Sequence, residues 1–164
     1  MVLRALMFGL VALISSNSLY ELNKKKVDKV LDKIWEETSV EVNPINSNYA
    51  LRGDYYELKS NEETFAYMVI DKAKSKVDEF TYMVLFNTDA SIQQVSVLQY
   101  RENYGGEIAS KRFLKQYIGK TAGNQMEYLK DIDGISGATI SVRSINRGVK
   151  RNSEEFYSYL TQDK

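Results

Sequence analysis

A series of strand-type segments between residues 55 and 100 constrains the fold of this chain more than any other feature. Phe65–Ile70 and Phe80–Phe86 are runs of aromatic, β-branched and other apolar residues, and such runs are typical of half-buried or buried strands. Ile92–Tyr100 partly alternates between apolar and polar residues, which also predicts a strand. Tyr55–Leu58 is a shorter candidate.

The connections between these segments are short. The charged stretch Lys72–Lys76 and the polar stretch Asn87–Ala90 each read as a turn. Parallel strands need a crossover of a dozen or more residues, so these connections predict an antiparallel meander.

Helical patterns flank the strand region on both sides. Val27–Glu37 places its apolar residues on one face and its charges on the other, and a second apolar face runs from Ile140 to Leu160. The glycine pair Gly105–Gly106 predicts a turn before a third helix, Glu107–Ile118. We therefore expect an α+β domain, an antiparallel sheet packed with helices.

Composition excludes several kinds of chemistry. The chain has no cysteine and no histidine, which excludes disulfides, thiolate nucleophiles and histidine-ligated metals. Adjacent acidic pairs do not face each other on a helix, so a solvated surface is the better interpretation of them. Asp131 and Asp133 lack the further ligands of an EF-hand, so we expect no metal site. We name no catalytic residue. The formal net charge is +0, and this balance does not favour nucleic acid as a partner.

The first twenty residues resemble an export signal. Arg4 precedes the apolar segment Ala5–Ile14, and Ser16 and Ser18 supply small residues where a signal peptidase reads. The apolar segment is shorter than the ~20 residues that span a bilayer. We expect residues 1–20 to be a signal peptide or N-terminal anchor, cleaved near Ser18, with one domain over 21–164. The alternative is a buried N-terminal helix of a cytoplasmic protein.

A small-residue motif precedes the C-terminal helical pattern. Asp133 is followed after two residues by Ser136, Gly137, Ala138 and Thr139. Ser136 is a favourable helix N-cap, and Gly137 and Ala138 allow a bulky group to approach the backbone. Thr139 would then lie in the first helical turn, where free N–H groups and the helix dipole favour a phosphate.

This motif resembles the flavinylation motif of the FMN-binding domain family. That family includes the C and G subunits of sodium-pumping and Rnf-type redox complexes, and small exported homologues. The resemblance implies that a flavin transferase uses FAD to attach FMN through its phosphate to Thr139, and that Asp133 is required by the transferase. Ser136, Gly137 and Ala138 complete the motif without departure.

A second stretch resembles the same family. The family has a strand, a Glu-Thr-Pro-Gly-type turn and a helix with an aromatic residue. Here the matching positions are filled by Glu102, Gly105, Gly106 and Phe113, while Asn103-Tyr104 replaces the Thr-Pro pair. The resemblance places the FMN site between this strand–turn–helix corner and the start of the C-terminal helix. Candidate ring-covering residues are Tyr104, Phe113 and Tyr117, and candidate cationic partners of the flavin are Lys111, Arg112 and Lys115.

The resemblance implies an exported electron-transfer flavoprotein, periplasmic or on the outer face of the cytoplasmic membrane. Its partners would be a flavin transferase and membrane-associated redox donor and acceptor proteins. Two alternatives remain open. One is a flavin-dependent reductase acting on its own small-molecule substrate, and the other is a binding module that is never modified.

Overall fold

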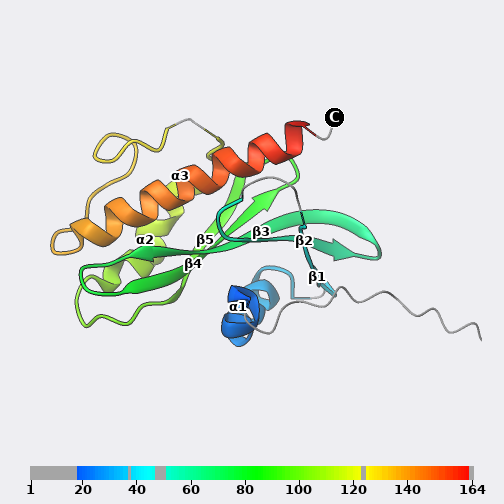
Figure 1. Cartoon of the computed structure of the whole chain (residues 1–164), viewed down its shortest axis with the longest axis horizontal. Coiled ribbons are helices and arrows are strands. Elements are labelled where there is room, and N and C mark those ends of the chain that lie inside the picture. The colour runs from blue at the N-terminus through cyan, green and yellow to red at the C-terminus, as the bar shows by residue number, and fades with distance from the viewer. Residues whose placement is uncertain (1–17, 37, 47–50, 123–124, 163–164) are drawn as a thin grey trace, which may run out of the picture.

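The computed structural model describes residues 18–36, 38–46, 51–122 and 125–162. It contains a five-stranded antiparallel sheet in the order β1-β2-β3-β4-β5, with helices on both faces (Figure 1). This confirms the predicted α+β fold. The elements in chain order are α1 (Leu19–Ile34), β1 (Glu41–Pro44), β2 (Asp54–Ser60), β3 (Glu63–Lys74), β4 (Glu79–Asn87), β5 (Ile92–Gln99), the 3-10 helix η1 (Gly106–Ala109), α2 (Lys111–Leu114), the 3-10 helix η2 (Lys115–Tyr117) and α3 (Thr139–Gln162).

The meander follows the predicted connections with one difference. β3 continues through most of the stretch predicted as a turn, and the turn itself is tighter, closed by the Ser75 amide donating to the Asp78 carbonyl at 2.8 Å. Pairing with β4 extends to the register Lys74↔Glu79. Strand pairing thus outweighs the turn preference of the charged residues, because the side chains of Lys72 and Lys74 remain exposed to solvent when the strand continues.

β4 is buried on both faces of the sheet along nearly its whole length. Tyr82, Val84 and Phe86 belong to the core beneath α3, while Met83 and Leu85 belong to the core above α1. Side chains of a strand alternate between faces, so a strand that is covered on both sides must be apolar throughout. This explains why the segment shows no alternation in the sequence.

α3 covers one face of the sheet with the apolar face that the sequence predicts. Val142, Ile145, Val149 and Phe156 are all fully buried. Phe156 stacks on Phe86 with ring centroids 4.6 Å apart. The exception is Ile140, which is 52% exposed at the beginning of the helix.

α1 covers the opposite face and begins earlier than predicted. Ser18 caps it, because its Oγ accepts a hydrogen bond from the Glu21 amide at 3.2 Å. Tyr20 packs on Tyr56 at a centroid distance of 5.4 Å. The helix therefore includes the last two residues of the segment expected to be a leader, whose first seventeen residues lie outside the described part of the chain.

No helix among the described residues is long and apolar enough to cross a membrane.

The predicted helix Glu107–Ile118 is wrong in detail, because it is divided into η1, α2 and η2. Ser110 adopts an extended conformation (φ −68°, ψ 139°) that ends η1, and its Oγ then caps α2 by accepting from the Phe113 amide at 3.4 Å.

Candidate functional site

Thr139 is the first residue of α3 and its side chain is exposed. The Ala138 carbonyl accepts the first helical hydrogen bond, from the Val142 amide at 2.9 Å. The amides of Thr139 and the two residues after it therefore have no partner within the helix. The predicted position of Thr139 in the first turn is confirmed. The predicted N-cap is wrong, because Ser136 lies three residues before the helix, in an exposed turn.

The turn before α3 is open to solvent on one side and packed on the other. Gly137 has φ +82°, and a Cβ built on it would meet no atom within 4 Å. Ala138, by contrast, is 4% exposed. The turn thus presents an accessible backbone next to Thr139 while Ala138 anchors it to the protein.

Ala138 packs against the glycine turn that contains Gly105. Gly105 has φ +80°, and a Cβ built on it would lie 3.4 Å from the Cβ of Ala138 and 2.7 Å from the hydroxyl oxygen of Tyr100. The two sequence stretches that carry the family resemblance are therefore in contact in space. Gly106 shares neither constraint, because it is exposed and nothing lies within 4 Å of a Cβ built there.

Tyr100 links the end of the sheet to both turns. Its hydroxyl donates to the Tyr104 carbonyl at 2.9 Å and lies 3.1 Å from the Ser141 Oγ. Its ring packs on Phe80 at a centroid distance of 5.4 Å. These contacts hold the Tyr104 backbone beside the first turn of α3.

The loop leading to α3 is held by three further contacts. The Asp133 amide donates to Gln116 Oε1 at 2.8 Å, which ties the motif to η2. The Asn146 side chain donates to the Met126 carbonyl at 2.9 Å. The Arg143 guanidinium lies over the Tyr128 ring, 5.0 Å from its centroid. The start of α3 is thus positioned by the loop, the corner and the sheet together.

This arrangement suits an anionic ester at Thr139. Free amides and the positive end of a 24-residue helix dipole meet there. Arg143 follows one helical turn later, on the same side as Thr139, and its side chain is exposed. Sequence reasoning missed Arg143, although its i+4 spacing from the acceptor was a readable signal.

Exposed apolar side chains also gather around the start of α3. Tyr104 is 83% exposed beside Gly105, and Ile140 is 52% exposed in the first turn of the helix. Leu129 is 69% exposed, and its Cδ2 would be 3.1 Å from a Cβ built on Gly134. Large exposed apolar groups around one polar anchor are suited to contact with a flat aromatic ligand.

Several other predicted site residues have structural tasks instead. Glu102 closes the β3–β4 hairpin: its Oε1 accepts from the Ser75 hydroxyl and from the amides of Val77 and Asp78, at 2.9 Å and 3.2 Å for the amides. These hydrogen bonds, led by that of Ser75, hold the pKa of Glu102 below its ordinary value. The carboxylate of Glu102 is thus committed to the turn.

Residues 106–118, which comprise η1, α2 and η2, are here called the α2 segment. The two predicted ring-covering residues of this segment are core residues. Phe113 is 4% exposed and Tyr117 is fully buried, with their rings edge to face at 5.9 Å. Burial raises the pKa of Tyr117 well above its ordinary value. Lys111 and Lys115 line a groove toward α1, and Arg112 is exposed. Of the three aromatic candidates, only Tyr104 is exposed beside the motif.

Comparison with known proteins gives a family model that matches part of the chain, and a shared fold. Residues 75–153, from the β3–β4 turn into α3, match the model of the FMN-binding domain. No curated protein sequence matches the chain.

Two solved structures share the fold at low identity. The crystal structure of Shewanella oneidensis NqrC has a TM-score of 0.57 and 15% identity, over 88% of this chain and 100% of that one. A crystal structure from Parabacteroides distasonis, of a subunit of the Na(+)-translocating NADH-quinone reductase, has a TM-score of 0.54 and 13% identity, over 86% and 94% of the two chains.

Proposed function

The chain carries an FMN-binding domain over residues 75–153, and from this premise we propose that it is an electron-transfer flavoprotein with FMN joined through its phosphate to Thr139. The observation that carries the proposal is the position of Thr139. Its exposed hydroxyl stands at the start of α3, next to a glycine turn with open space around it. A transferase can reach such a hydroxyl, and the helix start can hold the phosphate.

The neighbouring hydroxyls are poorer acceptors. Ser141 is 3% exposed and its Oγ contacts Tyr100. Ser144 is 9% exposed and accepts a hydrogen bond from the Lys74 amide at 2.8 Å. Ser136 is exposed but precedes the helix, so it lacks the adjoining free amides. Geometry therefore favours Thr139 among the four.

Different residues around Thr139 would then bind different parts of the FMN. The free amides of the first turn and Arg143 would bind the phosphate, while Tyr104, Leu129 and Ile140 would contact the apolar ring system. FMN, when bound, would supply one- or two-electron transfer. The protein's part is to place the ring at the surface, where an electron partner can approach it.

The test is co-expression with an active flavin transferase, followed by in-gel flavin fluorescence after denaturation and peptide mass mapping. We expect wild type and Thr139→Ser to carry covalent FMN and Thr139→Ala to carry none. Ala is a good helix former, so Thr139→Ala should keep the fold. Asp133→Ala should reduce modification with Thr139 still present.

Matched controls separate the acceptor from its surroundings. Ser136→Ala should still carry covalent FMN, because its hydroxyl is not the acceptor. Arg143→Gln should still be modified but should show a shifted reduction potential or a slower modification rate. Covalent FMN on folded Thr139→Ala would disprove the acceptor, and unmodified wild type would remove the basis of the proposal.

We further propose that the chain is exported and exchanges electrons with redox proteins at the membrane. The two structural neighbours, NqrC and a subunit of a Na(+)-translocating NADH-quinone reductase, support partners of that kind. Cleavage after Ser18 would leave Leu19 as the N-terminus, and the Leu19 nitrogen lies 2.6 Å from Asp54 Oδ2. The new ammonium would therefore meet a carboxylate at the start of β2.

N-terminal sequencing of the protein from its native host tests this step. We expect Leu19 as the first residue. Asp54→Asn should destabilise the cleaved form by about 1–3 kcal/mol, because a charge-assisted hydrogen bond is lost, and should destabilise the uncleaved form less. An intact Met1 in the cytoplasmic fraction would contradict export.

A further inference from the structure

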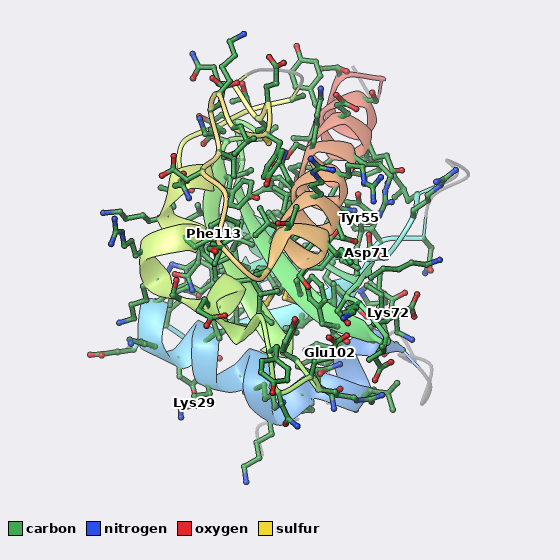
Figure 2. All side chains as sticks on the ribbon, turned by 90° about the vertical axis from the view of Figure 1, so that its left-hand side faces the viewer. Lys29, Tyr55, Asp71, Lys72, Glu102 and Phe113 are labelled. Carbon is green, nitrogen blue, oxygen red and sulfur yellow. The ribbon has the colours of Figure 1, made fainter. Side chains whose placement is uncertain are left out.

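A groove of about 610 Å³ runs along β5 at the end of the molecule away from the β1 edge. One wall is α1, which contributes Val30 and Ile34, and the other is the α2 segment, which contributes Leu114 and Ile118. Residues 94–97 of β5 form the floor. Figure 2 shows α1 in blue below the yellow-green α2 segment at this end of the molecule, with Lys29 on α1.

The floor of the groove is an open sheet edge. β5 is the last strand of the sheet, and only Ile92 pairs outward, with its amide donating to the Lys120 carbonyl at 2.8 Å and its carbonyl accepting from the Gly119 amide at 2.7 Å. After Ile92, the rest of β5 forms no outward backbone hydrogen bond with another described segment. The opposite edge, β1, has four residues and ends in Pro44, which blocks pairing.

Four lysines surround this edge, two on each wall. Lys29 and Lys33 come from α1, and Lys111 and Lys115 come from the α2 segment. Among the described residues, no carboxylate forms an ion pair with any of the four. Lys33 and Lys111 approach each other closely enough that the charge of Lys111 lowers the pKa of Lys33.

We propose that the β5 groove binds an extended acidic segment of a partner protein, which adds to the sheet as a sixth strand beside residues 94–97. The unpaired edge supplies backbone hydrogen bonds, and the lysines supply charge complementarity. The groove does not include residues 133–141 of the candidate flavin site. A partner bound here would leave Thr139 and its surroundings free.

The two walls fit the alternation of an added strand. α1 packs on one face of the sheet, and the α2 segment packs on the other with Leu114 in the core beneath α3. Successive side chains of a strand point to opposite faces. Two consecutive acidic residues in the partner would therefore meet one lysine pair each, and apolar neighbours would meet the apolar part of each wall.

The probe is a seven-residue peptide, Val-Glu-Glu-Val-Glu-Glu-Val, with acetylated and amidated ends. Binding to the purified full chain is measured by fluorescence anisotropy, and the site is mapped by amide chemical shifts and hydrogen exchange. We expect saturable binding, new protection of amides within residues 94–97, and weakening of binding with added salt. The same peptide with N-methyl groups at alternate backbone nitrogens should bind about tenfold more weakly, because it keeps the charge but loses strand pairing.

The variant pair Lys33→Glu with Lys111→Glu should weaken binding by about tenfold or more, since it reverses one charge on each wall. The matched control is Lys72→Glu with Lys150→Glu, two exposed lysines outside the groove, which should leave binding unchanged.

Three results would overturn the proposal. If the N-methylated peptide bound as tightly as the unmodified peptide, the groove would be a basic surface that attracts anions without strand pairing. Binding of phosphatidylglycerol vesicles through the same lysines, without binding of the peptide, would assign the groove to a lipid surface. Failure of the peptide to bind at all would mean that the lysines protect the edge from pairing. The test requires no flavin, so each outcome is independent of the proposed function.

Discussion

At the scale of single residues, the glycine pair at the strand–turn–helix corner shows how one position can carry a constraint that its neighbour lacks. Gly105 combines a left-handed conformation with close contact to Tyr100 and Ala138. Gly106 has an ordinary conformation and open space. A glycine pair in a sequence predicts a turn, but the backbone angles and neighbours of each glycine in the folded turn determine which of the two is required.

We therefore expect Gly105→Ala to lower the free energy of unfolding by about 2–4 kcal/mol, combining the strain of φ +80° with the displacement of Tyr100. Chemical denaturation of the purified variant measures this loss. Displacement of Tyr100 would also disturb its contact with Ser141, so amide signals of the first turn of α3 should shift.

Two controls divide the effect into its parts. Gly106→Ala should change stability by about 0.5 kcal/mol or less, as for other unconstrained surface positions. Gly137→Ala should cost about 1–2 kcal/mol, because it has φ +82° but no neighbour within 4 Å. Equal stability of all three variants would show that neither strain nor contact matters at this corner.

At the scale of elements, α3 carries a glycine where helix propensity disfavours one. Gly148 lies in the middle of the helix, and a Cβ built on it would lie 2.9 Å from Tyr82 Cζ and closer still to the hydroxyl. The Tyr82 hydroxyl donates to Asn152 Oδ1 at 2.5 Å and approaches Asp71 Oδ2 at 3.2 Å. The glycine thus lets α3 approach β4 and makes room for a buried hydrogen-bond network.

Gly148→Ala should therefore destabilise the protein by about 1–3 kcal/mol through overpacking, although Ala is favoured over Gly in an isolated helix by about 1 kcal/mol. In a Tyr82→Phe background the loss should be smaller, because the hydroxyl is gone. Urea denaturation of the four proteins in this double-mutant cycle measures the coupling. A stabilising Gly148→Ala would mean that the helix and β4 are not in close contact there.

At the scale of the whole molecule, the chain has twelve tyrosines and no histidine. Desolvation raises the pKa of buried Tyr56 to about 12, and burial raises the pKa of Tyr55 and Tyr82 further. These tyrosines stay protonated in the folded state, whereas in the unfolded chain they ionise near pH 10. Their contribution to stability is complete below pH 10 and is lost as pH rises above it.

We expect the urea midpoint to fall steeply above pH 10. Each buried tyrosine lowers the free energy of unfolding by up to about 1.4 kcal/mol per pH unit in this range, and the midpoint falls with it. No histidine titrates between pH 5 and 8, so the midpoint should vary little there. Tyr56→Phe should make the alkaline fall shallower, while Tyr157→Phe, at a position that is 49% exposed, should not. A midpoint that stays constant to pH 11 would contradict the burial of these rings.

Much of the architecture was predictable from local pattern. The runs at Phe65–Ile70 and Phe80–Phe86 form the central strands, and the apolar face of the C-terminal segment is the buried face of α3. β1 was not predicted, because four residues with a proline contain too little pattern. The division of the α2 segment was also missed, since it depends on the extended conformation of Ser110.

The candidate site divides in the same way. The motif from Asp133 to Thr139 could be located in the sequence, because glycine, small residues and a hydroxyl before a helical pattern have a local physical meaning. The structural roles of Glu102 and Phe113 could not be predicted from the sequence. Whether a carboxylate caps a hairpin, or an aromatic ring enters the core, depends on which distant segment lies next to it.

The sequence by itself determined the α+β class, the order of the four strands β2 to β5, and a hydroxyl at the start of the last helix, because period and turn chemistry act over a few neighbouring residues. Only the tertiary structure decided that Gly105 contacts Ala138, that the Tyr104 backbone lies beside the first turn of α3, and that four lysines meet across the β5 edge. Those relations join residues far apart in the chain. The packing of helices on the two faces of the sheet brings them together, and no local pattern encodes it.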